Sequence, residues 1–159
     1  MALPSTEEAK EIALLFCQGM AQMVTIDRRG QPTGRTLGSR LKPDWSVDVF
    51  SYKSFKRIDQ VRRKPNVLFI WEEQPASGTK KVIFGKGKAD VIDGEGCGQA
   101  YEEEMERRGV KSEMNAASAA ERLSLVRVRL TELRLEGFAA PGSELLREDV
   151  RTGLTVRLT

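Results

Sequence analysis

The chain has 159 residues, 31% of them charged, and a net charge of +3, so the field of the whole molecule is weak and local clusters of charge matter more than the total. It contains no histidine, which excludes a Ser-His-Asp or Cys-His nucleophile and a His-ligated haem, and leaves a typical zinc site short of ligands. We expect no metal site, and a cofactor would have to carry the chemistry of an enzyme with this composition.

The sequence gives no sign of a membrane or secreted protein. No run of about 18 apolar residues is present, and the first residues carry acids where a signal peptide would carry bases. We therefore expect a cytoplasmic protein with no membrane partner, folded as one domain over residues 1–159. Cys17 and Cys97 lack the spacing of a metal or redox pair and are expected to be structural thiols.

The first third of the chain predicts one helix and three strands. Ser5 and Glu8 form a capping box that begins an amphipathic helix. The turn from Asp27 to Gly30 predicts a hairpin, and Val47 and Val49 alternate with polar residues as in a half-buried strand. The expected bounds are 5–20 for the helix and 21–27, 31–41 and 45–49 for the strands.

A basic segment, "SYKSFKRIDQVRRKP" at 51–65, follows the third strand. Its apolar residues recur at three-residue intervals, which predicts a short helix that ends at Pro65. Two strands are expected next, at 66–71 and 81–92. Gly85 and Gly87 inside the second of these indicate a bulge, a bend or a close backbone approach. Trp45 and Trp71 are expected in the core or in dimer contacts.

The remainder predicts helices and then a long strand. The acid-rich segment 94–111 and the segment 116–123 read as surface helices, and the glutamates at 102–104 and 106 are expected on a solvated face. The strand 123–138 switches its apolar parity, so we expect a bulge near Thr131. The tail could add a hairpin around 151–153. Because no regular βαβ alternation is present, we predict a mainly β fold with helices (α+β), built as an antiparallel barrel with helices over its openings.

The charges of the basic segment divide into two groups along the expected helix. With Ser54 as N-cap, Lys56 and Arg57 lie in the first turn, where cations are disfavoured by the helix dipole. The cations at 62–64 lie in the last turn, where they complement the dipole and need no functional reason. An anion bound at the start of the helix would explain the first group.

Over residues 20–93 the chain resembles the FMN-binding split-barrel family, the superfamily of pyridoxamine 5'-phosphate oxidase. The similar features, in order, are the D-x-x-G turn, "GQPTGR" like G-x-P-x-x-R, "FS" at the end of a strand, the basic helix, "KPNV" like N-P-x-V and "GKAD" like G-x-A-E. A weaker similarity covers the strand at 123–136. The resemblance implies a split antiparallel barrel.

In that family an arginine on the second strand, a basic residue five positions later and a basic pair at the start of the short helix hold the flavin phosphate. The resemblance implies that these are Arg35, Arg40, Lys56 and Arg57. A bulge at Gly38 would bring Arg35 and Arg40, which have opposite strand parity, to one face. The other cofactor contacts that the resemblance implies come from Thr36, Leu37, Phe50, Ser51 and Gln60.

The resemblance implies a flavin-dependent oxidoreductase that moves a hydride from a reduced donor to a small acceptor, with FMN bound at a homodimer interface. Two alternatives share the fold: a reductase that uses the deazaflavin coenzyme F420, and a non-catalytic flavin-binding sensor or storage protein. Haem is less favoured because histidine is absent. A nucleic-acid-binding module that uses the basic residues at 53–64 is a fourth alternative, disfavoured by the nearly balanced total charge. Catalytic side chains and the small-molecule substrate are not identified by the sequence.

Overall fold

The computed structural model describes residues 3–145 and 153–158, which contain four helices and seven strands. The predicted order of helices and strands is confirmed, while residues 151–152 of the predicted tail hairpin lie outside the described residues. The bounds, in chain order, are α1 (Thr6–Phe16), β1 (Met20–Ile26), β2 (Pro32–Gly38), β3 (Ser46–Tyr52), α2 (Lys56–Arg63), β4 (Asn66–Glu73), β5 (Lys81–Ile92), α3 (Glu95–Arg108), α4 (Ala116–Arg122), β6 (Leu123–Glu136) and β7 (Leu154–Arg157).

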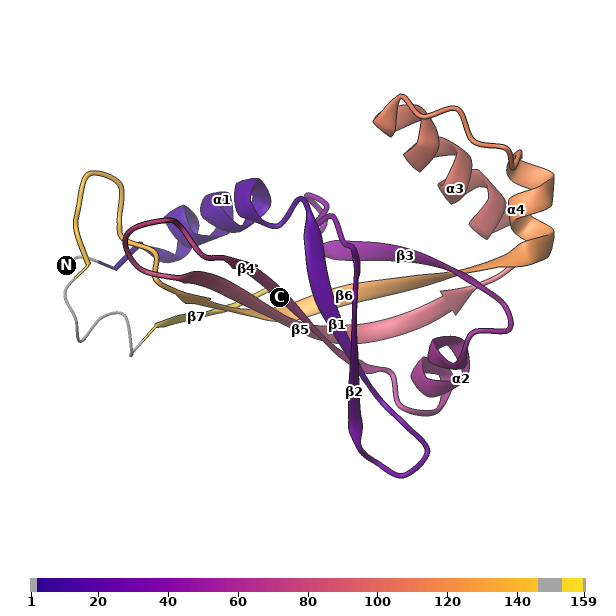
Figure 1. Ribbon diagram of the computed structural model, residues 1–159, viewed down its shortest axis with the longest axis horizontal. Helices are drawn as coiled ribbons and strands as arrows, with labels where there is room; N and C mark the ends of the chain where they lie inside the picture. Colours follow the sequence, from indigo (N-terminus) through magenta and orange to yellow (C-terminus); the bar gives the residue numbers. More distant parts are fainter. Residues whose placement is uncertain (1–2, 146–152, 159) are drawn as a thin grey trace.

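All described strand pairs are antiparallel, in the order β2-β1-β4-β5-β6-β3, with β7 added alongside β6. The long strands β5 and β6 run through the middle of the molecule and the β1–β2 hairpin crosses them (Figure 1). The predicted α+β class with an antiparallel sheet is confirmed. Because β2 and β3 stand at opposite ends of the strand order, the segment that joins them passes from one edge of the sheet to the other.

The bulge predicted near Thr131 is confirmed. Lys86 of β5 pairs with Glu132 of β6, but the next residue, Gly87, pairs with Leu130, so Thr131 has no partner across the ladder. A Cβ atom at Gly87 would lie 2.3 Å from the carbonyl oxygen of Arg129. The glycine in β5 therefore permits the close backbone approach that accompanies the bulge on the neighbouring strand.

One hydrophobic core fills the inner face of the sheet. Met23 and Phe69 are fully buried there, and Trp71, with 2% of its surface exposed, donates from its indole Nε1 to the Ser39 carbonyl at 3.0 Å. The amphipathic helix α1 covers one end through Ala9 and Ala13. Its predicted capping box is present, with the Ser5 hydroxyl and the Glu8 carboxylate each accepting from the other's backbone N–H.

The helix α2 begins one residue later than expected. Its N-cap is Phe55, which makes no side-chain capping bond, so the prediction of Ser54 as N-cap is wrong. The cause is a turn after β3, in which the Phe55 N–H donates to the Tyr52 carbonyl and the two aromatic rings meet edge to face. Lys56 and Arg57 still occupy the first turn of the helix.

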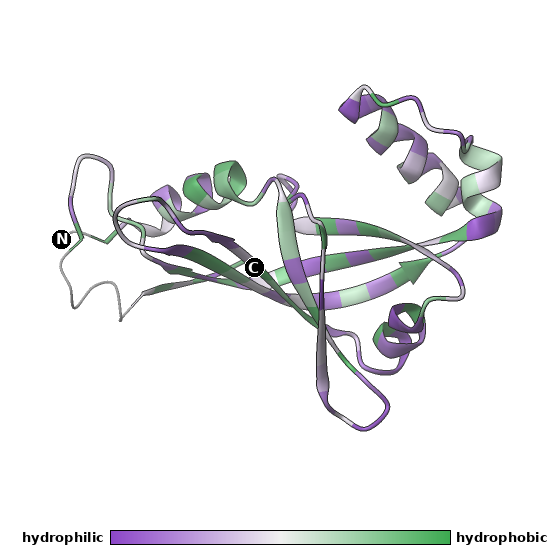
Figure 2. Ribbon diagram, in the orientation of Figure 1, coloured by the Kyte–Doolittle hydropathy of each residue, from purple (hydrophilic) through white to green (hydrophobic). Residues whose placement is uncertain are grey.

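The helices α3 and α4 pack together beyond the end of β3 and β6 (Figure 1). A second, smaller core joins them to the sheet, with the Phe50 ring edge to face on Tyr101 and the Cys97 thiol buried beside Leu123. In Figure 2 the ribbon of α3 carries both hydrophilic and hydrophobic residues. Both cysteines are buried and unpaired, as predicted. No helix in the described part of the chain combines the length and apolarity that crossing a bilayer requires.

Candidate anion-binding site

Arg35 reaches the inner side of the sheet from the edge strand β2. It pairs with the buried Met23 of β1, and directly paired residues share one face. Its guanidinium donates to the Gln60 Oε1 atom at 3.3 Å and to the Thr25 hydroxyl at 3.5 Å. Burial lowers the pKa of Arg35, because a partly desolvated cation is less favourable than a hydrated one.

The start of α2 brings two further cations to Arg35. Arg57 lies over the Phe55 ring, 5.1 Å from its centroid, and is half-buried. Burial and, second, the charge of Arg35 lower the pKa of Arg57. Within the described residues neither Lys56 nor Arg57 forms an ion pair. The first turn of a helix also leaves backbone N–H groups without intrahelical partners. Repelling cations and free N–H donors thus meet at one place.

These groups line a hollow of about 410 Å³, which we call the cradle. No acidic residue belongs to its lining, which consists of Thr33, Arg35, Ser54, Phe55, Lys56, Arg57 and Gln60. A larger groove of about 1010 Å³ shares five of these residues and continues along α2. A small anion in the cradle would relieve the repulsion between the arginines and accept charge-assisted hydrogen bonds.

Two of the three cations in the second half of the basic segment, Arg62 and Arg63, are paired with acids. Arg63 pairs with Asp59 at 2.9 Å, and Arg62 pairs with Asp93 at 2.7 Å. Asp59 also binds Arg28 from the β1–β2 turn. A hydrogen bond from Arg63 lowers the pKa of Asp59, and a hydrogen bond from the Ser124 hydroxyl lowers the pKa of Asp93. The predicted division of the segment by position along the helix therefore agrees with the pairing of its charges.

Five of the predicted cofactor contacts lie outside the lining of the cradle. Thr36 is exposed on the outer face of β2, and Leu37 packs against the core. Phe50 packs on α3, and Ser51 is buried with a hydroxyl that makes no hydrogen bond within the described residues. Arg40 pairs with Glu104 of α3. The structure thus brings together Arg35, Lys56, Arg57 and Gln60.

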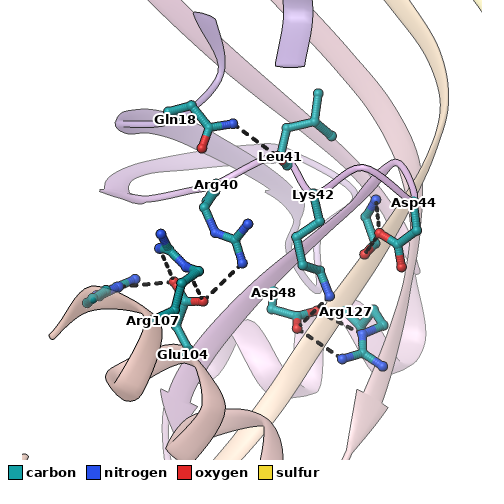
Figure 3. Close-up of polar contacts among 11 residues, drawn as sticks. Gln18, Arg40, Leu41, Lys42, Asp44, Asp48, Glu104, Arg107 and Arg127 are labelled. Carbon is teal, nitrogen blue, oxygen red and sulfur yellow. Dashed lines mark hydrogen bonds and ion pairs between the residues drawn. The ribbon is translucent and has the colours of Figure 1, made fainter. Parts of the chain in front are cut away.

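The bulge expected at Gly38 is wrong. The strand β2 pairs with β1 without interruption and ends at Gly38. Arg40 lies beyond that end and pairs with Glu104 of α3 at 3.1 Å (Figure 3). Glu104 is therefore not on a solvated face as predicted, since only 14% of its side chain is exposed and Arg107 and Arg108 also donate to it.

A second ion cluster beside it ties the edge strand to the sheet. Asp48 of β3 accepts from Lys42 at 2.9 Å and from both ends of the Arg127 guanidinium at 2.8 and 2.9 Å (Figure 3). No motif in the sequence indicates this cluster. Its signal is weak, because Asp48 and Arg127 are cross-strand neighbours separated by 79 residues.

No protein-family model matches the chain, and no curated protein is detectably similar to it in sequence. Solved structures do match. An F420 reductase is 15% identical over 76% of this chain and 93% of its own, with a TM-score of 0.59. A candidate pyridoxamine 5'-phosphate oxidase from Listeria innocua is 16% identical over 81% and 97%, with a TM-score of 0.60.

A heme binding protein from Mycobacterium smegmatis is 11% identical and matches 99% of this chain and 60% of its own, with a TM-score of 0.63. At these identities the comparisons establish the fold. The chain has the split-barrel fold of the pyridoxamine 5'-phosphate oxidase-like proteins, and the resemblance found in the sequence is confirmed at that level.

Proposed function

We propose that the protein is a flavin-dependent oxidoreductase that holds the phosphate of FMN in the cradle. The observation that carries the proposal is the pair of partly desolvated, mutually repelling guanidinium groups of Arg35 and Arg57, in a hollow whose lining contains no acid. When bound, FMN would supply hydride transfer between a reduced donor and a small acceptor. Arg35, Lys56, Arg57 and Gln60 would hold and orient the phosphate.

The other predicted contacts of the cofactor remain predictions. A phosphate contact from Arg40 would require its guanidinium to leave Glu104. Ring and ribityl contacts from Thr36, Leu37, Phe50 and Ser51 would come from outside the lining of the cradle. We propose that residues 1–159 form one split-barrel domain.

We further propose a homodimer. The outer face of the middle strands supports it, because four apolar side chains there are only half-buried although they lie in the sheet: Val24, Leu68, Ile70 and Phe84. A dimer formed through this face would bury these four side chains, and a flavin ring at the dimer interface, which the family resemblance implies, remains a prediction. Light scattering at micromolar concentration tests the dimer, and a monomeric mass would contradict it.

The phosphate contact is tested by titrating the protein with FMN and with riboflavin, which lacks the phosphate, and following quenching of the flavin fluorescence. We expect FMN to bind at least ten times more tightly than riboflavin. Arg57→Ala should weaken FMN binding by about tenfold or more, since one charge-assisted hydrogen bond contributes about 1.5–3 kcal/mol. The matched control is Arg63→Ala on the same helix, whose cation is already paired. Equal effects of the two variants would refute the assignment of the cradle.

The oxidoreductase part needs a separate experiment. Anaerobic addition of NADH or NADPH to the FMN-loaded protein should bleach the visible absorption of the flavin if a nicotinamide is the donor, with FMN free in buffer as the control. Binding without reduction by these or other reduced donors would instead favour the sensor or storage alternative.

A second candidate cofactor, F420, is favoured by the groove that continues from the cradle. The phosphate of FMN is terminal, whereas that of F420 is a diester that continues into a chain of carboxylates. Arg29 and Lys53 line the groove and form no ion pair within the described residues, so they could meet such a chain. Tighter binding of F420 than of FMN, lost in Lys53→Ala, would select this alternative. A haem Soret band on mixing with haemin, or nucleic-acid binding that falls steeply with salt, would favour the remaining two.

A further inference from the structure

Thr25 is the polar member of an otherwise apolar row on β1. The residues of this strand that face inward are Ala21, Met23 and Thr25, and none of the Thr25 surface is exposed. A hydroxyl that is buried without a hydrogen-bond partner destabilises the folded protein. The Thr25 hydroxyl avoids this cost by donating to the Gln60 Oε1 atom at 2.6 Å. The contact joins the sheet to α2 beneath the cradle.

Gln60 is likewise a polar residue on a buried stripe. It lies with Ile58 and Val61 on the inner face of α2 and is 8% exposed. Its side-chain oxygen also receives the guanidinium of Arg35 at 3.3 Å. A guanidinium can only donate hydrogen bonds, so this contact fixes which way the amide is turned. The oxygen must face Arg35 and Thr25, and the Nε2 group must face away from them.

The orientation of the amide decides what Gln60 presents to the cradle. Gln60 lines both the cradle and the groove, and its Nε2 group makes no hydrogen bond within the described residues. With the oxygen occupied by two donors, the free end of the side chain offers N–H groups. An amide turned the other way would offer an oxygen, which repels the oxygens of an anion.

We infer that Thr25 is a positioning residue of the proposed phosphate site: through Gln60 Oε1 it holds the guanidinium of Arg35 in place and keeps the Gln60 amide turned so that its oxygen is held by Arg35 and Thr25 and does not face the ligand. The inference rests on the proposed function. It assigns a role to a buried hydroxyl that touches no ligand, and it makes Gln60 a neutral donor among three cations. The ligand class it selects is a fully deprotonated oxyanion, which accepts hydrogen bonds at every oxygen.

The test compares Thr25→Val, which keeps the shape of the side chain and removes the hydroxyl, with Thr25→Ser, which restores the hydroxyl. The readout is the ratio of the riboflavin and FMN dissociation constants, because this ratio isolates the phosphate. We expect Thr25→Val to lower the ratio by roughly tenfold, in line with the loss of one or two hydrogen bonds in a charged network. The ratio for Thr25→Ser should stay within about threefold of the wild-type ratio. The control Thr155→Val, at an exposed position of β7, should leave the ratio at the wild-type value.

A second substitution covers the possibility that Thr25→Val perturbs folding. Gln60→Glu keeps the size of the side chain but replaces the free N–H group by an anionic oxygen, and should lower the ratio by about a hundredfold or more. An unchanged ratio in both variants, or an equal loss of FMN and riboflavin affinity, would overturn the inference. Wild-type protein that binds FMN no better than riboflavin would instead refute the proposed phosphate site, and the inference with it.

Discussion

Glu104 lies at the centre of the ion cluster in Figure 3, and its replacement by glutamine should lower the free energy of unfolding by about 3 kcal/mol at neutral pH. The carboxylate is 14% exposed and accepts from Arg40, Arg107 and Arg108. Although burial opposes ionisation, these three donors lower the pKa of Glu104 from 4.5 to about 2. Each unit of difference between the unfolded and folded pKa corresponds to about 1.4 kcal/mol, so ionised Glu104 stabilises the folded protein by about 3 kcal/mol. Breaking a buried pair and leaving one cation uncompensated costs a similar 3–5 kcal/mol, roughly.

The pH dependence follows from the sign of the shift. Because the folded pKa lies below the unfolded one, the stabilisation by Glu104 is complete above about pH 4.5 and is lost as the pH falls through about 2. Urea unfolding followed by tryptophan fluorescence should show the full difference between wild type and Glu104→Gln at pH 7 and about half of it at pH 3. Glu106→Gln, an exposed neighbour on the same helix, is the control and should change little. A Glu104→Gln loss below about 0.5 kcal/mol, or a loss independent of pH, would refute the reasoning.

Three further predictions concern stability and thiol reactivity. Gly87→Ala should destabilise the protein by about 2 kcal/mol or more, because the new methyl group would lie 2.3 Å from a backbone oxygen. The control Gly38→Ala has open space around its methyl group and should leave the free energy of unfolding nearly unchanged, as measured by chemical denaturation. Ser5→Ala removes the capping box and should lower the free energy of unfolding by about 1 kcal/mol in the same assay. Burial raises the pKa of Cys17 and of Cys97, so neither thiol should react with Ellman's reagent until the protein is unfolded in urea; rapid reaction in the native state would contradict the burial.

The parts of the fold that depend on neighbouring residues were predictable from the sequence. The Ser5–Glu8 capping box involves residues only three positions apart. The change in apolar parity around Thr131 predicted the bulge, because a bulge shifts which residues face the core. The position of Arg57 in the first turn was also predictable. The start of α2 was misplaced by one residue because the Tyr52–Phe55 ring contact, formed across a turn, outweighed the capping preference of Ser54.

The parts that depend on residues far apart in the chain were not predictable. Arg40 was assigned to the phosphate because its sequence position matched a motif, but it pairs with Glu104, 64 residues away. Alternation along a strand gives the face of Arg35 but not its partners. The contacts of Arg35 with Thr25 and Gln60 require the register of β1 with β2 and the placement of α2, which a single sequence does not contain.

Because of where the cradle lies, ligand affinity depends on the folding of the whole barrel. Arg35 comes from β2, at one end of the strand order, whereas Arg57 follows β3, at the other end. The two guanidinium groups meet only when the sheet has curled so that its edges approach. A ligand that bridges them would therefore resist global unfolding rather than local fraying, adding about 2.7 kcal/mol at a free concentration one hundred times its dissociation constant. By the same linkage, a substitution that destabilises the barrel far from the cradle would weaken cofactor binding, although the substituted residue makes no contact with the cofactor.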